Sequence, residues 1–174
     1  MFDILTQAIG FVGTGLMIVS YQCKKSRNLF LLHMASNVAY IIHFIMLNAL
    51  TGSISIFLGL VRNRILSVPD KKWAQWKGWM PLIIVLNVIT TVVTWKDMFS
   101  ILPCLGMVTM TIFSWSRNGK KIRMANFLVN SPSWLIYDIH THSISGIFAE
   151  LFCMGSIIIS FVRYGTKALD GDGE

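Results

Sequence analysis

The sequence predicts an all-α polytopic membrane protein with seven transmembrane helices, arranged as two triple-helix repeats joined by a linker helix. Of its 174 residues, 54% are hydrophobic and only 13% are charged, which is unusual for a soluble domain. Apolar runs recur along the chain, and most approach the ~20 residues needed to cross ~30 Å of hydrocarbon. The segments that begin at Lys24 and Lys120 are also similar to each other, which indicates an internal repeat.

The positive charges alternate along the chain. Fourteen of the fifteen Lys and Arg residues fall on alternate connections, and the connections between these contain only Lys96. By the positive-inside rule, basic loops stay in the cytoplasm, which predicts seven spans with the N-terminus outside and the C-terminus inside. Topology therefore explains the net charge of +7, and we expect no nucleic acid partner.

The first repeat, residues 1–66, is predicted to contain spans at 4–22, 28–47 and 52–66. In the first span, Gly10, Gly13 and Gly15 have the small-residue spacing that permits close helix contact. The turn before the third span is too short for anything but an antiparallel neighbour.

A linker at residues 67–95 is expected to follow the first repeat. Just before it, we expect Arg62 and Arg64 to extend toward the cytoplasmic headgroups. Residues 67–78 interleave basic residues with tryptophans, which suits a segment at the membrane surface. The apolar run at 80–94 has no counterpart elsewhere and is predicted to be the linker helix.

The second repeat, residues 96–164, is predicted to contain spans at 98–115, 120–142 and 143–163. A flexible cytoplasmic tail is expected at 165–174. Because a single helix separates two units of three, both units should have the same orientation in the membrane, which makes this a parallel repeat.

The second span of each repeat contains the sequence features that the two repeats share. Both spans begin with Lys-Lys-x-Arg and carry a central asparagine, Asn37 or Asn130. In the later span, one helical stripe holds four polar residues, which are Asn126, Asn130, Ser133 and Tyr137. Pro132 removes a backbone hydrogen bond within this stripe. A polar stripe beside a broken turn predicts a solute site next to a hinge.

These paired motifs and the 3+1+3 layout resemble the SWEET/PQ-loop (MtN3-like) superfamily and, within it, the YgjV-type bacterial inner-membrane proteins. The resemblance covers residues 4–163 and implies alternating access along a central path in the bacterial inner (plasma) membrane, with a periplasmic N-terminus. Pro103 and Pro132 match the hinge prolines of SWEET transporters. A sugar substrate does not follow, because SWEET substrate asparagines lie on the third helix of each unit, whereas Asn37 and Asn130 lie on the second.

Six residues are candidates for solute binding, namely Asn37, Tyr40, Asn130, Trp134, Tyr137 and Glu150. A carboxamide donates and accepts hydrogen bonds, so the asparagines suit a polar solute, with interhelical bonding as an equal alternative. The aromatic residues either stack on a solute ring or anchor the helices at the interface. Glu150 either couples a proton to transport, binds a cationic solute, or only packs within the bundle.

The histidines near the predicted outer surface suggest a different chemistry. Asp138, His140 and His142 form a D-x-H-x-H pattern that suits a zinc site or a pH-sensitive gate, although exposed loop histidines are common. The spacing matches no recognised metal site, so we expect no metal and no other cofactor. No catalytic constellation is evident, which argues against an enzyme.

We therefore expect a transporter that moves a small polar solute, such as a sugar, a vitamin or a nucleoside-like molecule. The main alternative is a non-transporting membrane sensor or scaffold with the same fold, and a membrane enzyme that uses the His/Asp group is a third hypothesis. The expected partners are the solute and the lipid bilayer. A homo-oligomer is possible, but no stripe of residues in the sequence identifies an interface for it.

Overall fold

The computed structural model describes residues 2–170, and within this range it contains helices and no β-strand, which confirms the all-α prediction. The α-helices are α1 (Phe2–Tyr21), α2 (Ser26–Met46), α3 (Leu50–Ser67), α4 (Trp79–Val93), α5 (Ile101–Trp115), α6 (Gly119–Ala125), α7 (Ser131–His140) and α8 (Ile144–Ala168). Short 3-10 turns at Lys72–Gln75 and Met98–Ser100 precede α4 and α5. A π-helical turn at Asn126–Asn130 joins α6 to α7 in one bent rod.

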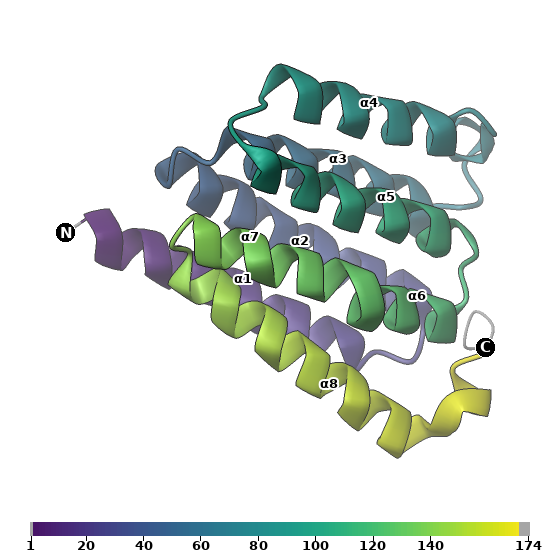
Figure 1. Ribbon diagram of the computed structural model, residues 1–174. Helices are drawn as coiled ribbons and strands as arrows, with labels where there is room; N and C mark the ends of the chain where they lie inside the picture. The colour runs from purple at the N-terminus through teal and green to yellow at the C-terminus, as the bar shows by residue number, and fades with distance from the viewer. Residues whose placement is uncertain (1, 171–174) are drawn as a thin grey trace.

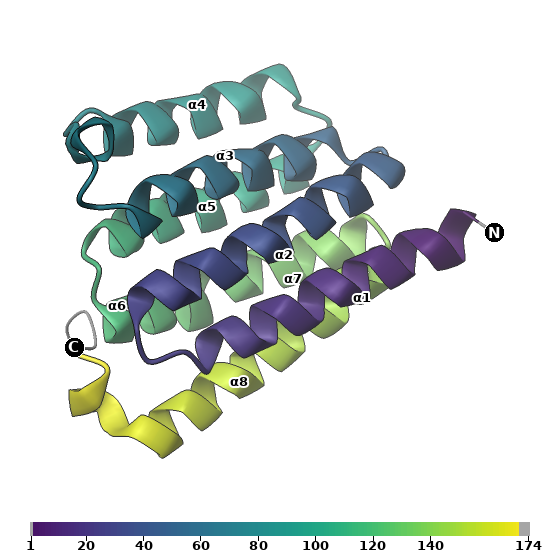
Figure 2. The same ribbon diagram turned by 180° about the vertical axis from the view of Figure 1, so that it is seen from behind.

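The helices form two layers of three, with α4 along one edge (Figure 1). One layer contains α1, α2 and α3, and the other contains α5, the α6–α7 rod and α8, as the reverse view shows (Figure 2). The layers join where α3 packs on α5 and where α1 packs on α8, so six helical rods close a ring. The remaining helix, α4, packs only against the outside of α3 and α5 among the main contacts.

The surface of the ring is apolar and its interior is polar. Every rod exposes large apolar side chains, as α8 does with Phe148, Leu151, Phe152, Ile158 and Val162. The buried residues include Arg62, Arg123, Asp138 and Glu150. Four helical segments are long and apolar enough to cross a membrane, at Ile4–Tyr21, Arg27–Met46, Met98–Trp115 and Ile144–Ala168. This inverted polarity is the arrangement expected in a lipid environment.

The second helix of each layer ends in the same turn. Asn48 after α2 and His142 after α7 both adopt left-handed backbone conformations, with φ of 54° and 57°. In each case the next N–H bonds back over five residues at 2.9 Å, from Ala49 to Phe44 and from Ser143 to Asp138. This is the Schellman arrangement, which satisfies the last carbonyls of a helix and reverses the chain.

Two ends of the bundle are distinguished by charge. The basic end is where α1, α3, α5 and α8 finish, and the far end is where α2, α4 and α7 finish. At the basic end, Gly165 breaks α8 with a φ of 72°, and Leu169 is buried against α6 while its carbonyl accepts from the N–H of Lys120 at 2.6 Å. The described part of the predicted flexible tail therefore packs on the bundle, and residues 171–174 lie outside the described range.

Candidate functional site

A narrow cavity of about 60 Å³ lies between the two layers. All six rods of the ring contribute to its wall, and α4 does not. Its polar lining residues are Tyr21, His33, Asn37, Tyr40, Arg62, Asn126, Asn130, Asp138 and Glu150. The volume has room for about four water molecules. A drug-sized ligand needs about 300 Å³ or more, so a larger solute requires the layers to separate.

Unpaired polar atoms concentrate around this cavity. Among the described residues, eight buried side-chain atoms have no hydrogen-bond partner, and five of them belong to residues of the cavity wall. These five atoms are His33 Nε2, Arg62 Nη1, Asn130 Oδ1, Asp138 Oδ1 and Glu150 Oε2. A buried polar atom without a partner costs several kcal/mol in an apolar medium. The wall therefore presents five atoms that can form further hydrogen bonds.

Five of the six predicted binding residues line the cavity, namely Asn37, Tyr40, Asn130, Trp134 and Glu150. The sixth, Tyr137, does not. It packs nearer the far end, where the absence of a side chain at Gly52 makes room for its ring, and it borders a separate recess.

The two paired asparagines differ in their surroundings. In the amide orientation that satisfies both of its groups, Asn37 donates to the carbonyl of His33 and accepts from the N–H of Leu60, each at 3.1 Å. Asn37 thus ties α2 to α3. In contrast, Oδ1 of Asn130 has no partner and lies beside Gly106, where even a methyl group would come within 2.7 Å of it. Only Asn130 has a free group to offer a solute.

A directed chain of hydrogen bonds connects Asn130 to Glu150. Nδ2 of Asn130 donates to Oδ1 of Asn126 at 2.6 Å, and Nδ2 of Asn126 donates to Oγ of Ser131 at 3.0 Å. The hydroxyl of Ser131 in turn interacts with the carboxyl of Glu150. A change at the cavity face of Asn130 therefore reaches the surroundings of this carboxyl through polar side chains.

The two predicted hinge prolines lie in different backbone settings. Pro132 follows the π turn, in which the N–H of Ser131 bonds to the carbonyl of Asn126 five residues earlier. A proline ring displaces the carbonyl four residues before it, and π turns often mark functional sites. Pro103 lies in the first turn of α5, where its missing N–H breaks no bond within the helix.

Arg62 and Arg123 are buried inside the bundle. Arg62 is 3% exposed and lines the cavity, so the expectation that it extends to the headgroups is wrong, whereas Arg64 is exposed. Arg123 donates to Ser160 Oγ and to the carbonyls of Gly119, Tyr21 and Cys23 at 2.9–3.0 Å. The sequence reading missed Arg62 as a site residue, although its position twelve residues into α3 marks it as an intramembrane charge.

A second cluster of polar side chains is buried near the far end of the bundle, beside the cavity. Nδ1 of His43 donates to the carbonyl of Thr6 at 2.8 Å, and Nε2 contacts Ser143 Oγ at 3.0 Å and Ser145 Oγ at 3.2 Å. The hydroxyl of Ser143 also interacts with the carboxyl of Asp138. Residues from α1, α2, α7 and α8 thus meet in one network between the two layers.

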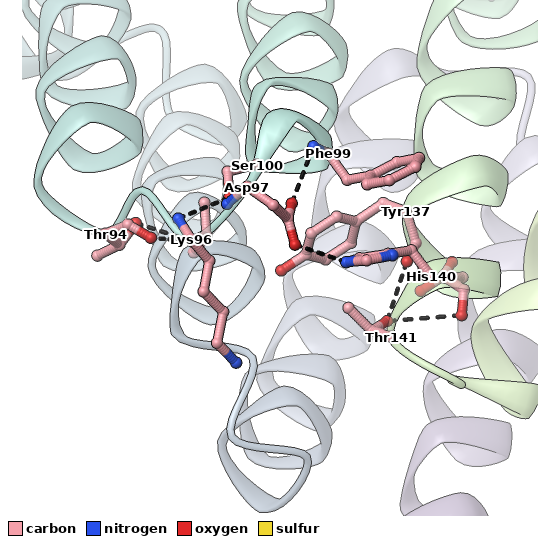
Figure 3. Close-up of polar contacts among 10 residues, drawn as sticks. Thr94, Lys96, Asp97, Phe99, Ser100, Tyr137, His140 and Thr141 are labelled. Atoms are coloured by element: carbon pink, nitrogen blue, oxygen red, sulfur yellow. Dashed lines mark hydrogen bonds and ion pairs between the residues drawn. The ribbon is translucent and has the colours of Figure 1, made fainter.

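A hydrogen bond joins the α4–α5 connection to the end of α7 (Figure 3). Nε2 of His140 donates to Oδ2 of Asp97 at 2.7 Å, and the ring of Phe99 stacks on the imidazole with centroids 4.2 Å apart. The N–H of Phe99 donates to the other carboxylate oxygen at 2.9 Å. Although desolvation raises the pKa of Asp97, the hydrogen bonds from His140 and Phe99 outweigh it and lower the pKa. Figure 3 shows the Lys96 side chain pointing away from the pair.

The D-x-H-x-H pattern does not form a single cluster. Asp138 points into the cavity wall, His140 pairs with Asp97, and His142 occupies the exposed turn after α7. Across residues 2–170, no group of three or more His, Cys, Asp or Glu side chains is placed to hold a metal ion. The zinc alternative therefore has no geometric support in this part of the chain.

Comparison with known proteins identifies one family. Residues 4–168 match Imp-YgjV, described as bacterial inner membrane protein. No curated protein and no solved structure matches the chain.

Proposed function

We propose that this chain, which belongs to the Imp-YgjV family of bacterial inner membrane proteins, moves a small polar solute across that membrane. The observation that carries the proposal is the set of five buried polar atoms without partners around one cavity between the layers. In a protein that needs only rigidity, such atoms would be paired or replaced by apolar groups. Here they face a common space that six rods enclose.

The proposal includes a SWEET-like arrangement of seven spans, with the N-terminus outside and the basic end in the cytoplasm. It is supported by the two layers of three rods, by the position of α4 beside them and by the matching turns at Asn48 and His142. The assignment of the shorter helix α4 as a span is supported by its apolar surface, on which Leu82, Val85, Ile89, Val92 and Val93 are exposed. Parallel repeats commonly place the substrate site at their interface, near the middle of the membrane.

Transport by alternating access requires contacts between the layers at both ends to break in turn. At the far end these contacts are the bonds of His43 to Ser143 and Ser145, at 3.0 and 3.2 Å, and the bond from the Thr14 hydroxyl to the carbonyl of Ser145 at 3.4 Å. At the basic end they are the bonds from Arg123 to the end of α1. The π turn before Pro132 lies between the two groups and supplies a bending point in the α6–α7 rod.

A solute screen by thermal shift, followed by uptake into proteoliposomes, tests the proposal. We expect at least one small polar solute to raise the unfolding temperature of the purified protein. Asn130→Ala should abolish this shift, whereas Asn87→Ala, which removes a buried asparagine from α4 outside the cavity, should preserve it. The same solute should enter liposomes that contain the wild-type protein.

Two results would count against transport. A solute that binds in an Asn130-dependent way but never enters liposomes would favour the non-transporting sensor. The scaffold alternative predicts no binding at all, and also no reaction of soluble thiol reagents with Asn130→Cys in a background without Cys23, Cys104 and Cys153.

A further inference from the structure

The charges of the cavity are separated along its length, and from this we infer that the solute is zwitterionic, with a carboxylate bound at Arg62 and a cationic amine bound at Glu150. This inference rests on the proposed function and adds the substrate class. Arg62 is 3% exposed, Glu150 is 6% exposed, and each has a side-chain atom without a partner. Within residues 2–170, neither side chain forms an ion pair.

Helix geometry gives the axial separation of the two charges. Arg62 lies twelve residues after Leu50, the first residue of α3, and Glu150 lies six residues after Ile144, the first residue of α8. Both helices begin at the far end, so a rise of 1.5 Å per residue places Arg62 at a depth of about 18 Å and Glu150 at about 9 Å. The α-carbons are thus about 9 Å apart along the bundle axis.

Other groups on the wall follow the same polarity. His33 lies thirteen residues before the end of α2, a depth of about 20 Å, close to the level of Arg62. Tyr40 and Trp134 each lie six residues before the ends of α2 and α7, a depth of about 9 Å, at the level of Glu150. Aromatic faces attract cations, so these rings reinforce the end of the cavity that holds the carboxyl. Asn130 lies between the two levels.

The free donors of Arg62 suit a carboxylate. Nε of Arg62 is bonded to Oδ1 of Asn63 at 3.1 Å, which fixes the plane of the guanidinium, while Nη1 remains free. A planar guanidinium binds a carboxylate more selectively than an ammonium group does. At the other end, Oε2 of Glu150 and Oδ1 of Asp138 are both free acceptors.

Other solute classes leave a charge unpaired. A neutral sugar offers no counter-charge to Arg62 or to an ionised Glu150, and a buried charge without a partner is strongly unfavourable. A cation would be repelled by Arg62, and a simple anion would offer no positive group to the carboxyl of Glu150. A zwitterion pairs both charges and adds no net charge to the membrane interior.

The test uses 4-aminobutyrate and two capped forms of it, each of which lacks one of its two charges. We would measure binding by thermal shift, and uptake into proteoliposomes, for 4-aminobutyrate, for its amide, which is a cation, and for its N-acetyl derivative, which is an anion. Glycine is a shorter zwitterion and 6-aminohexanoate a longer one, whereas glucose carries no charge. We expect one of the zwitterions to bind at least about tenfold more tightly than its capped forms, because a buried charge that loses its partner is left desolvated and unpaired.

Variants assign each end of the solute. Arg62→Gln should remove the preference for the free carboxylate over the amide while leaving the preference for the free amine. Glu150→Gln should do the reverse. Arg64→Gln, an exposed change on the same helix, should alter neither preference. If Arg62→Gln does not fold, Arg62→Lys retains the charge and should weaken carboxylate binding without abolishing it.

The outcomes separate this inference from the proposed function. Asn130-dependent binding and uptake of a neutral solute, with no preference for zwitterions, would overturn the inference and leave transport intact. Preference for the N-acetyl anion would also overturn it, because Glu150 would then be uncharged in the bound state. Failure of every probe class to bind or enter liposomes would remove the proposed function itself.

Discussion

Arg123 and Tyr21 connect the two layers at the basic end. Nη2 of Arg123 donates to the carbonyl oxygen of Tyr21 at 2.9 Å, so a side chain of α6 caps the last residue of α1. The same nitrogen reaches the carbonyl of Cys23, and the guanidinium also bonds to α8 through Ser160. A cation at the C-terminus of a helix is further stabilised by the helix dipole.

Replacing Arg123 should therefore weaken the whole bundle. Arg123→Ala leaves two carbonyls at the end of α1 without their donor, and we expect the free energy of unfolding to fall by about 3 kcal/mol or more. Lys121→Ala removes an equal charge from the exposed face of α6 and should have little effect. Unfolding curves in mild detergent measure both, and equal stability of the two variants would contradict the role of Arg123.

The pair formed by Asp97 and His140 predicts a dependence of stability on pH. Because the pKa of Asp97 is lower in the folded protein than its ordinary value of 3.8, its carboxylate stabilises the fold at higher pH. This contribution is complete above the ordinary pKa and is lost as the pH falls through the lower, folded value. We expect the difference in unfolding temperature between the wild type and Asp97→Asn to be constant near neutral pH and to shrink below about pH 4.

The control for this pH series is Asp70→Asn, which neutralises an exposed carboxylate in the connection before α4. It should give no comparable difference from the wild type at neutral pH. A difference for Asp97→Asn that grows on acidification would show that the sign of the argument is wrong.

The glycines of α1 predict a contrast along a single helix. A methyl group at Gly10 would lie 2.8 Å from Cβ of Ser145 and 2.9 Å from Nδ1 of His43, whereas one at Gly15 would have nothing within 4 Å. We expect Gly10→Ala to destabilise the protein by about 1–3 kcal/mol through overpacking. Gly15→Ala should be neutral or stabilise by up to about 1 kcal/mol. Comparable melting temperatures would mean that α1 and α8 do not approach as closely as the structure has them.

Replacing the two prolines should have different effects on the unfolding temperature and on the rate of uptake. Pro132→Ala supplies an N–H that the α6–α7 rod lacks, so we expect a higher unfolding temperature and slower uptake of whichever solute is identified. Pro103→Ala adds an N–H in the first turn of α5, where no acceptor exists within the helix, and should change neither quantity. Faster uptake by Pro132→Ala would argue against a hinge at the π turn.

Most of the cavity wall could be predicted because a polar side chain in an apolar segment is unfavourable in lipid and is expected to point into the bundle. Asn130, Trp134 and Glu150 lie on helices whose remaining surface suits lipid, so their side chains had to face inward. Tyr137 shares a stripe with Asn130 in the sequence pattern, yet its ring packs against Gly52 and Phe44 and misses the cavity, which the next residue, Asp138, lines. The stripe predicted that these side chains are buried and not which of them border the cavity.

Arg62 and Asp138 were not predicted to line the solute cavity, for a different reason. Both lie near predicted helix ends, where long charged side chains usually reach water. In the structure α3 ends at Ser67, only one residue beyond the predicted end, yet Arg62 is buried on the cavity side while Arg64 on the same helix is exposed. The direction in which each side chain points, and not a displaced helix boundary, therefore decides whether the charge is solvated or buried.

The sequence by itself determined that this chain is helical, that its surface is apolar and that its basic residues alternate along the chain, because these properties depend on local composition and periodicity. Only the tertiary structure decided which polar groups share a cavity and which of them are already bonded. Asn37 and Asn130 occupy matching positions in two similar segments, but Leu60 satisfies one amide, while Gly106 leaves the other open. That difference arises from the neighbouring helix in each layer, and no pattern within a single segment contains it.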